Sequence, residues 1–581
     1  MRPTLIASIL VACVMSAPRA QSGRKPLSPA DITDIATLLK LEDIRLFDEV
    51  TLAGILKSSH PEVRRRAVQS IGRIVNEGGR ALLVSARQDA DVDVVATVAF
   101  ASGQLKDPGA VAWLDGLLSS PGTPAPVAKE AAIALGKIRT AEARAALAKY
   151  LLAAPATAAA VPVVGEALLA IGRFTGREDL SPMVKWSTSS NADLRWRAAW
   201  ALYRPRDPAA VPTLLTMTRD ASGDVRFWAV RGLGVPQAPA AGRRGAPPAT
   251  PPPAPLTDAE RERNSARLRE AVTDPDRRVR TEALRTLAGY DDDASFAVVL
   301  AALESPDTWL SVSAAEALGA QGRYASRAEA FVQKLVAAAA PSKPRALRIT
   351  ALTPLVSLAP AQAVEIADSL ARDSSLVARL AGVAALNRLD AAGRAKLDAL
   401  AADPATKALI PPSGRGQGAR PPAPVRTEAD YRAIVERWIV PDYNGAPKPR
   451  ATWTTPRGPI EIELYPGDAP MGVAYFVSLV ESGGIVGTEF GRLVPNFVAQ
   501  QRTIDGALTL RDEVNRRGLT RANLSWASAG LDTGRPGYTL GNTPQPHNEG
   551  DFTALGHVVR GMDVVDRLEL GDAVTATRMI R

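Results

Sequence analysis

The stretch HPEVRRRAVQSIGRI, residues 60–74, carries the pattern that decides the fold of most of this chain. Its apolar residues recur at intervals of three and four, from Val63 through Ala67 to Ile71, which is the spacing of one face of an α-helix. Similar phrases return further along, as APVAKEAAIALGKI at 125–138 and DRRVRTEALRTLAGY at 276–290. The sequence therefore predicts a series of related helices.

The end of each phrase recurs with a nearly constant period. A glycine, or a tyrosine in one case, closes the phrase about every 31 to 36 residues, at Gly72, Gly103, Gly136, Gly172, Tyr203 and Gly234. We expect each glycine to be a helix C-cap, and a second helix, such as that at 111–120, to complete each unit. Helical hairpins of this length bury their apolar faces only by stacking, so we predict an all-α solenoid over residues 30–404, which resembles HEAT-like repeats.

Composition narrows the classes of function. The chain has 70 basic and 61 acidic residues, and because these are interspersed, its net charge of +9 does not indicate a nucleic-acid surface. Its one cysteine permits no internal disulfide and no thiolate metal site, and its three histidines, His60, His547 and His557, are too few and too scattered for a metal centre. We expect no metal and no cofactor.

The N-terminus has the layout of a secretory signal peptide over residues 1–21. Arg2 precedes an apolar run from Leu5 to Met15, which is too short to span a bilayer, and small residues follow. We therefore expect a secreted or periplasmic protein. A second interpretation stays open, in which Cys13 ends a lipoprotein cleavage box and carries a lipid anchor.

Two segments interrupt the helical pattern. Residues 235–256 are rich in proline and alanine, which predicts an insertion within the solenoid. Residues 405–450 are predicted to be a Pro/Gly-rich linker with a short helix at 427–440. The glycines at 414–418 lie between prolines and follow no strand, so they do not indicate a phosphate-binding loop.

Residues 451–581 form a predicted domain of a different class. Ile460, Ile462 and Leu464 alternate with Glu461 and Glu463, which is the two-residue period of a strand with one buried face. Helical spacing returns at 469–483, and further strand-like segments follow. Mostly β content with few helices favours a closed antiparallel barrel.

Several blocks of this domain resemble the cyclophilin-type peptidyl-prolyl cis-trans isomerases. The blocks are IEIELYP, DAPMGVAYFVSLVESG, GTEFGRLVPNFVAQ, RANLSWASAG and TPQPHNEGDFTALGHVVRGMDVVDRLE, in the family's order. The resemblance implies an eight-stranded antiparallel barrel with two helices, and an enzyme that acts on proline-containing polypeptides.

The resemblance also implies a substrate site. Its catalytic residue is Arg492, because a donor directed at the prolyl nitrogen helps only when the amide twists and the lone pair localises. The implied substrate-binding residues are Phe497, Val498, Gln500, Ala527, Ser528, Thr539, Asn548 and Phe552. Taken without these blocks, Arg492 is equally readable as a strand residue that points to solvent.

Part of the implied site departs from the family's pattern. Gly491 stands where the family has a histidine, and Gly537 where it has a glutamine. Thr539, Asn548 and Phe552 stand in place of a phenylalanine, a leucine and a histidine of the proline pocket. Each lost apolar contact costs about 1–2 kcal/mol, so we expect turnover weakened about 10- to 100-fold.

Three functional hypotheses remain open. The first is an exported isomerase that assists protein folding, with the solenoid as a platform for protein partners near the catalytic domain. The second is a scaffold or peptide-binding protein whose cyclophilin-like domain is degenerate. The third, an active site in the solenoid, lacks any cluster of carboxylates, histidines or nucleophiles in the sequence.

Overall fold

A computed structural model of the chain describes residues 24–176, 178–235, 255–320, 324–402, 404–407, 409, 425–504, 508–528 and 530–580. The predicted signal peptide with Cys13, almost all of the 235–256 insertion and most of 405–424 lie outside the described residues. Among the described helices, none is both long and apolar enough to cross a membrane.

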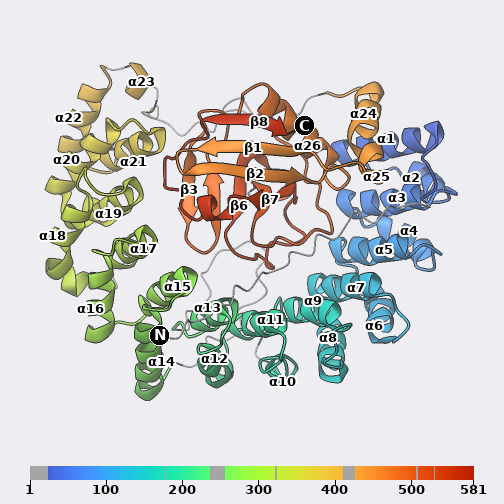
Figure 1. The fold of residues 1–581 in the computed structure, drawn as a ribbon, viewed down its shortest axis with the longest axis horizontal. Coiled ribbons are helices and arrows are strands. Elements are labelled where there is room, and N and C mark those ends of the chain that lie inside the picture. The colour runs from blue at the N-terminus through green and yellow to red at the C-terminus, as the bar shows by residue number, and fades with distance from the viewer. Residues whose placement is uncertain are drawn as a thin grey trace, which may run out of the picture.

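Residues 29–400 form a solenoid of paired helices that curves into an open ring (Figure 1). Each inner helix stacks on the next inner helix. The inner helices are α1 (Pro29–Ile44), α3 (Pro61–Ile74), α5 (Val92–Gln104), α7 (Ala125–Ile138), α9 (Val161–Ile171), α11 (Ala192–Tyr203), α13 (Gly223–Arg231), α15 (Arg277–Leu287), α17 (Thr308–Gly319), α19 (Arg345–Leu358) and α21 (Leu376–Leu386).

An outer row of helices covers the convex side (Figure 1). Its members are α2 (Glu49–Ile55), α4 (Gly79–Ala86), α6 (Val111–Ser119), α8 (Ala141–Ala153), α10 (Ser181–Val184), α12 (Val211–Met217), α14 (Asp258–Ala271), α16 (Asp293–Ala302), α18 (Ala328–Ala338), α20 (Pro360–Ala371) and α22 (Ala391–Leu400), and the short α23 (Pro404–Lys407) follows. The two rows enclose alanine-, leucine- and valine-rich cores.

Three of the recurring glycines have a different role from the predicted one, whereas Gly172 is the C-cap of α9, as predicted. Gly72, Gly103 and Gly136 lie within inner helices and are not left-handed caps. A Cβ atom on Gly72 would lie 2.9 Å from the Cα of Ala101 on the next inner helix, and one on Gly136 would lie 2.7 Å from the Cα of Ala170. At these three positions the glycine marks close helix–helix packing rather than a helix end.

Residues 428–443 form a helical segment that packs on the first repeat. The segment comprises α24 (Glu428–Ile434), a π-helical turn (Val435–Ile439) and α25 (Val440–Tyr443). Its buried residues Tyr431, Val435 and Ile439 join the core formed by α1, α3 and α5. Part of the segment that we expected to be a linker is thus integral to the solenoid.

The C-terminal domain is a curled antiparallel sheet of eight strands in the order β3-β4-β6-β5-β7-β2-β1-β8. The strands are β1 (Arg450–Thr455), β2 (Gly458–Leu464), β3 (Phe490–Val494), β4 (Val498–Gln501), β5 (Asn523–Ala527), β6 (Arg535–Gly541), β7 (Gly556–Arg560) and β8 (Ala576–Ile580). The segments that lead into edge strands β3 and β8 meet at the bridge between Glu489 and Ala573, which brings the two edges together. Helices α26 (Pro470–Glu481) and α27 (Met562–Val565) complete the domain.

Alternating residues of the strands fill the barrel, as the two-residue period predicts. Ile460, Ile462 and Leu464 of β2 are fully buried, whereas the glutamates between them are not. Trp453, Phe476 and Tyr538 pack their rings together, with centroids 5.0–5.9 Å apart. The predicted fold class, a HEAT-like solenoid followed by a cyclophilin-like barrel, is confirmed.

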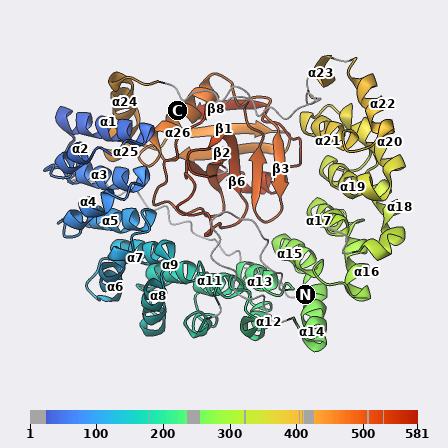
Figure 2. The same ribbon diagram turned by 180° about the vertical axis from the view of Figure 1, so that it is seen from behind.

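The barrel lies inside the ring of the solenoid, which both views show (Figures 1 and 2). At the N-terminal end, the buried Arg73 of α3 donates to the carbonyl oxygens of Val514 and Asp468 at 2.9 and 2.6 Å. At the other end, the Glu489 carboxylate accepts from the backbone N–H groups of Leu376 and Val377, both at 2.8 Å. The solenoid, which we considered as a platform for protein partners, therefore holds the chain's own barrel in its concave face.

Candidate functional site

Arg492 and Gln500 face each other across the first hairpin of the barrel. They are directly paired in the ladder of β3 and β4, where a register shift follows Phe490. The Arg492 guanidinium donates to the Gln500 side-chain oxygen at 3.1 Å and is otherwise exposed. Because a guanidinium carries five N–H donors, most of the donors of Arg492 remain available to a ligand.

Phe497 lies beside this arginine. The Arg492 Cζ atom is 5.6 Å from the centroid of the Phe497 ring, within the range of a cation–π contact. The turn before Phe497 requires a left-handed residue, Asn496, with φ of 61°. The Phe497 carbonyl then accepts from the Asn542 backbone and from the Gln545 side chain, both at 3.0 Å, which fixes the ring's position.

Two further predicted residues are neighbours in the sheet. Val498 is buried on β4, and Thr539 of β6 is paired with Gln500. The hydroxyls of Thr539 and Ser525 share a hydrogen bond of 2.6 Å. The position where the family has an apolar ring is thus occupied by a buried hydroxyl that is already paired within the barrel.

The other four predicted residues have their described contacts elsewhere than at Arg492. Ala527 ends β5 opposite Arg535. Asn548 closes its own turn, since its side-chain amide donates to the Gln545 side-chain oxygen at 2.9 Å. Ser528 and Phe552 line a separate hollow between the barrel and the solenoid.

The sequence does not indicate a place in the site for His547, which we considered only for a metal centre. Its ring stacks on Phe497 with centroids 5.9 Å apart and an interplanar angle of 25°. Burial, together with the nearby Arg204, Arg231 and Arg173 of the solenoid, lowers the pKa of His547 to about 4. The imidazole is therefore neutral at pH 7. No local sequence signal places it there, because its position depends on how a long loop docks.

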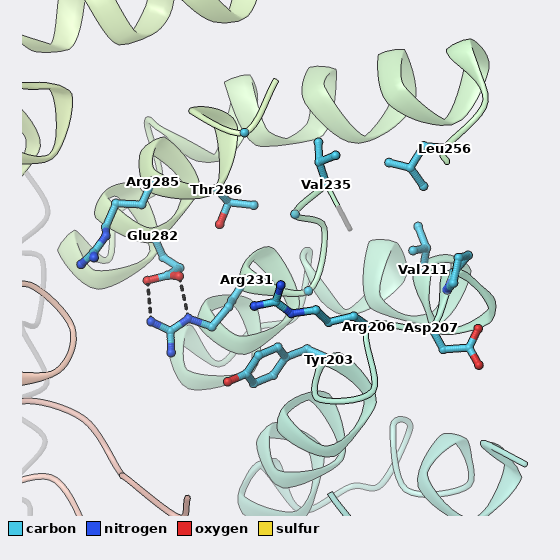
Figure 3. A pocket seen from close by; sticks show the side chains of 14 residues that line it. Tyr203, Arg206, Asp207, Val211, Arg231, Val235, Leu256, Glu282, Arg285 and Thr286 are labelled. Carbon is cyan, nitrogen blue, oxygen red and sulfur yellow. Dashed lines mark hydrogen bonds and ion pairs between the residues drawn. The ribbon is translucent and has the colours of Figure 1, made fainter. Parts of the chain in front are cut away.

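The solenoid holds the turn that carries Phe497. Arg285 of α15 donates to the Pro495 carbonyl at 2.9 Å, and the buried Asn496 side chain donates to the Arg278 carbonyl at 2.8 Å and to Glu282 at 3.3 Å. Glu282 is also paired with Arg231 at 2.7 Å. Figure 3 shows this pair and Arg285 at one side of a hollow of about 560 Å³ on the inner solenoid.

The loop that carries His547 is fixed in the same way. Arg173, which follows α9, donates to the carbonyl oxygens of Pro546 and Glu549 at 2.6 and 3.1 Å. Gln104 at the end of α5 donates to the Gly550 carbonyl at 3.1 Å. One wall of the site is thus built by strand pairing within the barrel, and the other is held by solenoid side chains.

This arrangement suits a reaction that needs one aligned donor and an apolar surface. Rotation about an X–Pro bond breaks no covalent bond but must overcome a barrier of roughly 18–20 kcal/mol from amide resonance. A fixed donor beside an apolar ring stabilises the twisted amide more than the planar one. Among the described residues, no group of three or more potential ligands is placed to hold a metal ion.

Comparisons with known proteins identify the families of both parts of the chain. Residues 451–580 match the family described as cyclophilin type peptidyl-prolyl cis-trans isomerase/CLD, and residues 49–126, 157–234 and 265–340 match HEAT repeats. A peptidyl-prolyl cis-trans isomerase of Helicobacter pylori is 34% identical over 21% of this chain and 82% of its own length. Peptidyl-prolyl cis-trans isomerase B of Bacillus subtilis is 34% identical over 21% of this chain and 90% of its own length. A solved cyclophilin-type isomerase of Cryptosporidium parvum aligns over 23% of this chain and 98% of its own, at 17% identity and a TM-score of 0.22.

Proposed function

Because this chain belongs, through its C-terminal domain, to the cyclophilin-type peptidyl-prolyl cis-trans isomerases, we propose that Arg492 is the residue that accelerates X–Pro rotation. Its contact with Gln500 and its position 5.6 Å from the Phe497 ring are the observations that support this assignment. In this assignment the guanidinium donates to the prolyl nitrogen as the amide twists, and the proline ring packs on Phe497 and Val498.

Gln500 has two tasks in this proposal. Its side-chain oxygen orients the Arg492 guanidinium, and its amide N–H₂ group, which donates to no other described residue, can donate to a substrate carbonyl. His547 supports the Phe497 ring from the solenoid side and, being neutral, adds no charge next to the proline pocket. Ala527 and Ser528, at the end of β5, are assigned to binding of the chain that flanks the proline, and Asn548 and Phe552 keep the proline-pocket positions that the resemblance implies.

A second candidate function is a scaffold whose barrel binds peptides with little catalysis. The observation that favours it is the Thr539 hydroxyl, which is buried and paired with Ser525 at the position of an apolar pocket wall. In this candidate the altered wall no longer aligns the proline ring with the Arg492 donor, so peptides bind but their X–Pro rotation is not accelerated.

We also propose that the protein is exported, to the periplasm or the exterior, and that it assists protein folding there. The support is the signal-peptide layout of residues 1–21, and the lipid-anchored alternative at Cys13 belongs to the same proposal. Since the barrel occupies the concave face, we place protein partners of the solenoid on its convex side. Mass spectrometry of the mature N-terminus distinguishes cleavage near residue 21 from a lipidated Cys13.

The proposed catalysis is tested by NMR exchange spectroscopy on Ala-Pro peptides with the full chain. We expect Arg492→Ala to lower kcat/KM about 100-fold or more, because it removes a donor used in the transition state. Arg560→Ala is the matched control, since Arg560 is a strongly exposed arginine of the same barrel. Peptides that bind the unmutated protein without faster exchange would identify the scaffold instead.

A further inference from the structure

A hollow of about 560 Å³ separates the barrel from the N-terminal half of the solenoid. Ser528, Leu531 and the segment 549–552 form its barrel wall. Residues at the ends of α3, α5, α7 and α9 form its solenoid wall: Val75, Gly103, Gln104, Lys106, Lys137, Ile138, Arg139 and Arg173. The hollow thus exists only because the two domains are docked.

Close contacts define the floor of the hollow. Gly550 has φ of 86°, and a Cβ atom there would lie 2.4 Å from the Lys137 side chain, so only glycine allows this approach. The Lys137 ammonium in turn donates to the Gln104 side-chain oxygen at 2.9 Å. With Arg173 bound to the carbonyl groups of the same loop, the floor is fixed by direct contacts.

The hollow has an excess of positive charge. Lys106, Lys137, Arg139 and Arg173 line it, against the two acidic residues Glu549 and Asp551. Lys106 and Arg139 are exposed, and neither side chain has a hydrogen-bond or ion-pair partner among the described residues. Burial and the neighbouring Glu166 raise the pKa of Glu549 to about 7, which reduces the negative charge near neutral pH. The walls therefore favour an anionic ligand.

The hollow also offers apolar surface and an unsatisfied polar atom. Val75 and Leu531 are 44% and 52% exposed, and Phe552 lies on the same wall. The Ser528 hydroxyl is buried without a hydrogen-bond partner among the described residues, which is costly unless a ligand supplies one. Ser528 directly follows β5 and is one of the residues assigned above to the flanking chain of the substrate.

We propose that this hollow is an extended binding site for an acidic segment of the polypeptide substrate, next to the isomerised X–Pro bond. The proposal rests on the proposed function, because the same chain enters from the Arg492 site along the end of β5. Its carboxylates meet Lys106 and Arg139, its apolar side chains meet Leu531 and Val75, and its backbone meets Ser528. The protein then selects prolines that lie close to acidic residues.

The test compares peptides that contain one Ala-Pro bond and three glutamates or three lysines, placed before or after the proline. NMR exchange with the full chain gives kcat/KM for each peptide. At low salt, we expect kcat/KM of the better glutamate peptide to be about tenfold higher than that of its lysine counterpart. This ratio of the two kcat/KM values should fall in 0.5 M NaCl. Arg139→Glu and Lys106→Glu should each lower the ratio about three- to fivefold, whereas Arg388→Glu, an exposed arginine beyond α21, should not change it.

Binding is measured separately from turnover, by anisotropy of the labelled peptides with Arg492→Ala protein. Glutamate-dependent binding that weakens in Arg139→Glu supports the site even if no peptide is isomerised, in which case only the proposed catalysis fails. Equal kcat/KM and equal binding for the glutamate and lysine peptides would overturn the site, whether or not the protein is an active isomerase.

Discussion

The two walls of the candidate site are built in different ways. Arg492, Phe497 and Gln500 belong to one hairpin, so strand pairing between residues less than ten apart positions them. His547 and its loop depend on Arg173, and the turn before Phe497 depends on Arg285 and Glu282, all of which are solenoid residues. The comparison teaches that the solenoid holds one wall of the candidate site in place, in addition to any role with partners.

The largest expected effect comes from breaking the solenoid-held wall at Glu282. Burial would raise the pKa of this carboxyl, but Arg231 and Arg285 hold it below its ordinary value. Glu282→Ala leaves Arg231 without its carboxylate, and we expect the free energy of unfolding to fall by about 3–4 kcal/mol in denaturant titrations. Glu270→Ala removes an exposed carboxylate that pairs with Arg219 and Arg267 and should cost less than about 1 kcal/mol, so equal losses would contradict this account.

The same wall predicts a dependence of stability on pH. His547 has a pKa of about 4 in the folded protein and about 6.5 when unfolded, so the unfolded state binds more protons between these values. Its contribution is present above pH 6.5 and is lost as the pH falls towards 4, by up to about 3 kcal/mol. The free energy of unfolding of the unmutated protein should therefore fall more steeply with falling pH than that of His547→Phe. If the two proteins show the same pH dependence, burial of the neutral His547 does not contribute to stability.

The wall formed by the hairpin is tested at Phe497. Phe497→Ala removes the apolar surface assigned to the proline ring, which is worth about 2 kcal/mol, and should lower kcat/KM about 30-fold. Phe497→Leu retains much of that surface and should lose less than about fivefold. If NMR exchange gives the same loss for both variants, the ring has another role.

The smallest expected effect concerns Thr539. Thr539→Val replaces the hydroxyl by a methyl group, so the proline pocket gains apolar wall while Ser525 loses its partner. We expect kcat/KM to rise about two- to threefold and the free energy of unfolding to fall by about 1 kcal/mol. A fall in kcat/KM with unchanged stability would show that the hydroxyl itself contacts the substrate.

The division between local and long-range contacts also separates the features that the sequence predicts from those that it does not. The helical period and the strand alternation are local patterns, and they could be predicted. The grouping of Arg492, Phe497 and Gln500 was implied by the family resemblance of the short segment that contains them. The glycine period is visible in the sequence, but its cause is not. The cause is close helix packing, such as that of Gly72 on Ala101, which involves residues of different repeats. The stacking of His547 on Phe497 and the docking of the barrel in the concave face depend on contacts between residues hundreds of positions apart.

The central claim, that the solenoid acts on catalysis through the Phe497 wall, is tested most directly by a double-mutant cycle of Arg285→Ala and Phe497→Ala in kcat/KM. Arg285 donates to the carbonyl two residues before Phe497, so it is a positioning residue in this account. We predict that Arg285→Ala costs about fivefold in the unmutated background and almost nothing in Phe497→Ala, because the ring that it positions is gone. The same fivefold loss in both backgrounds would contradict the claim.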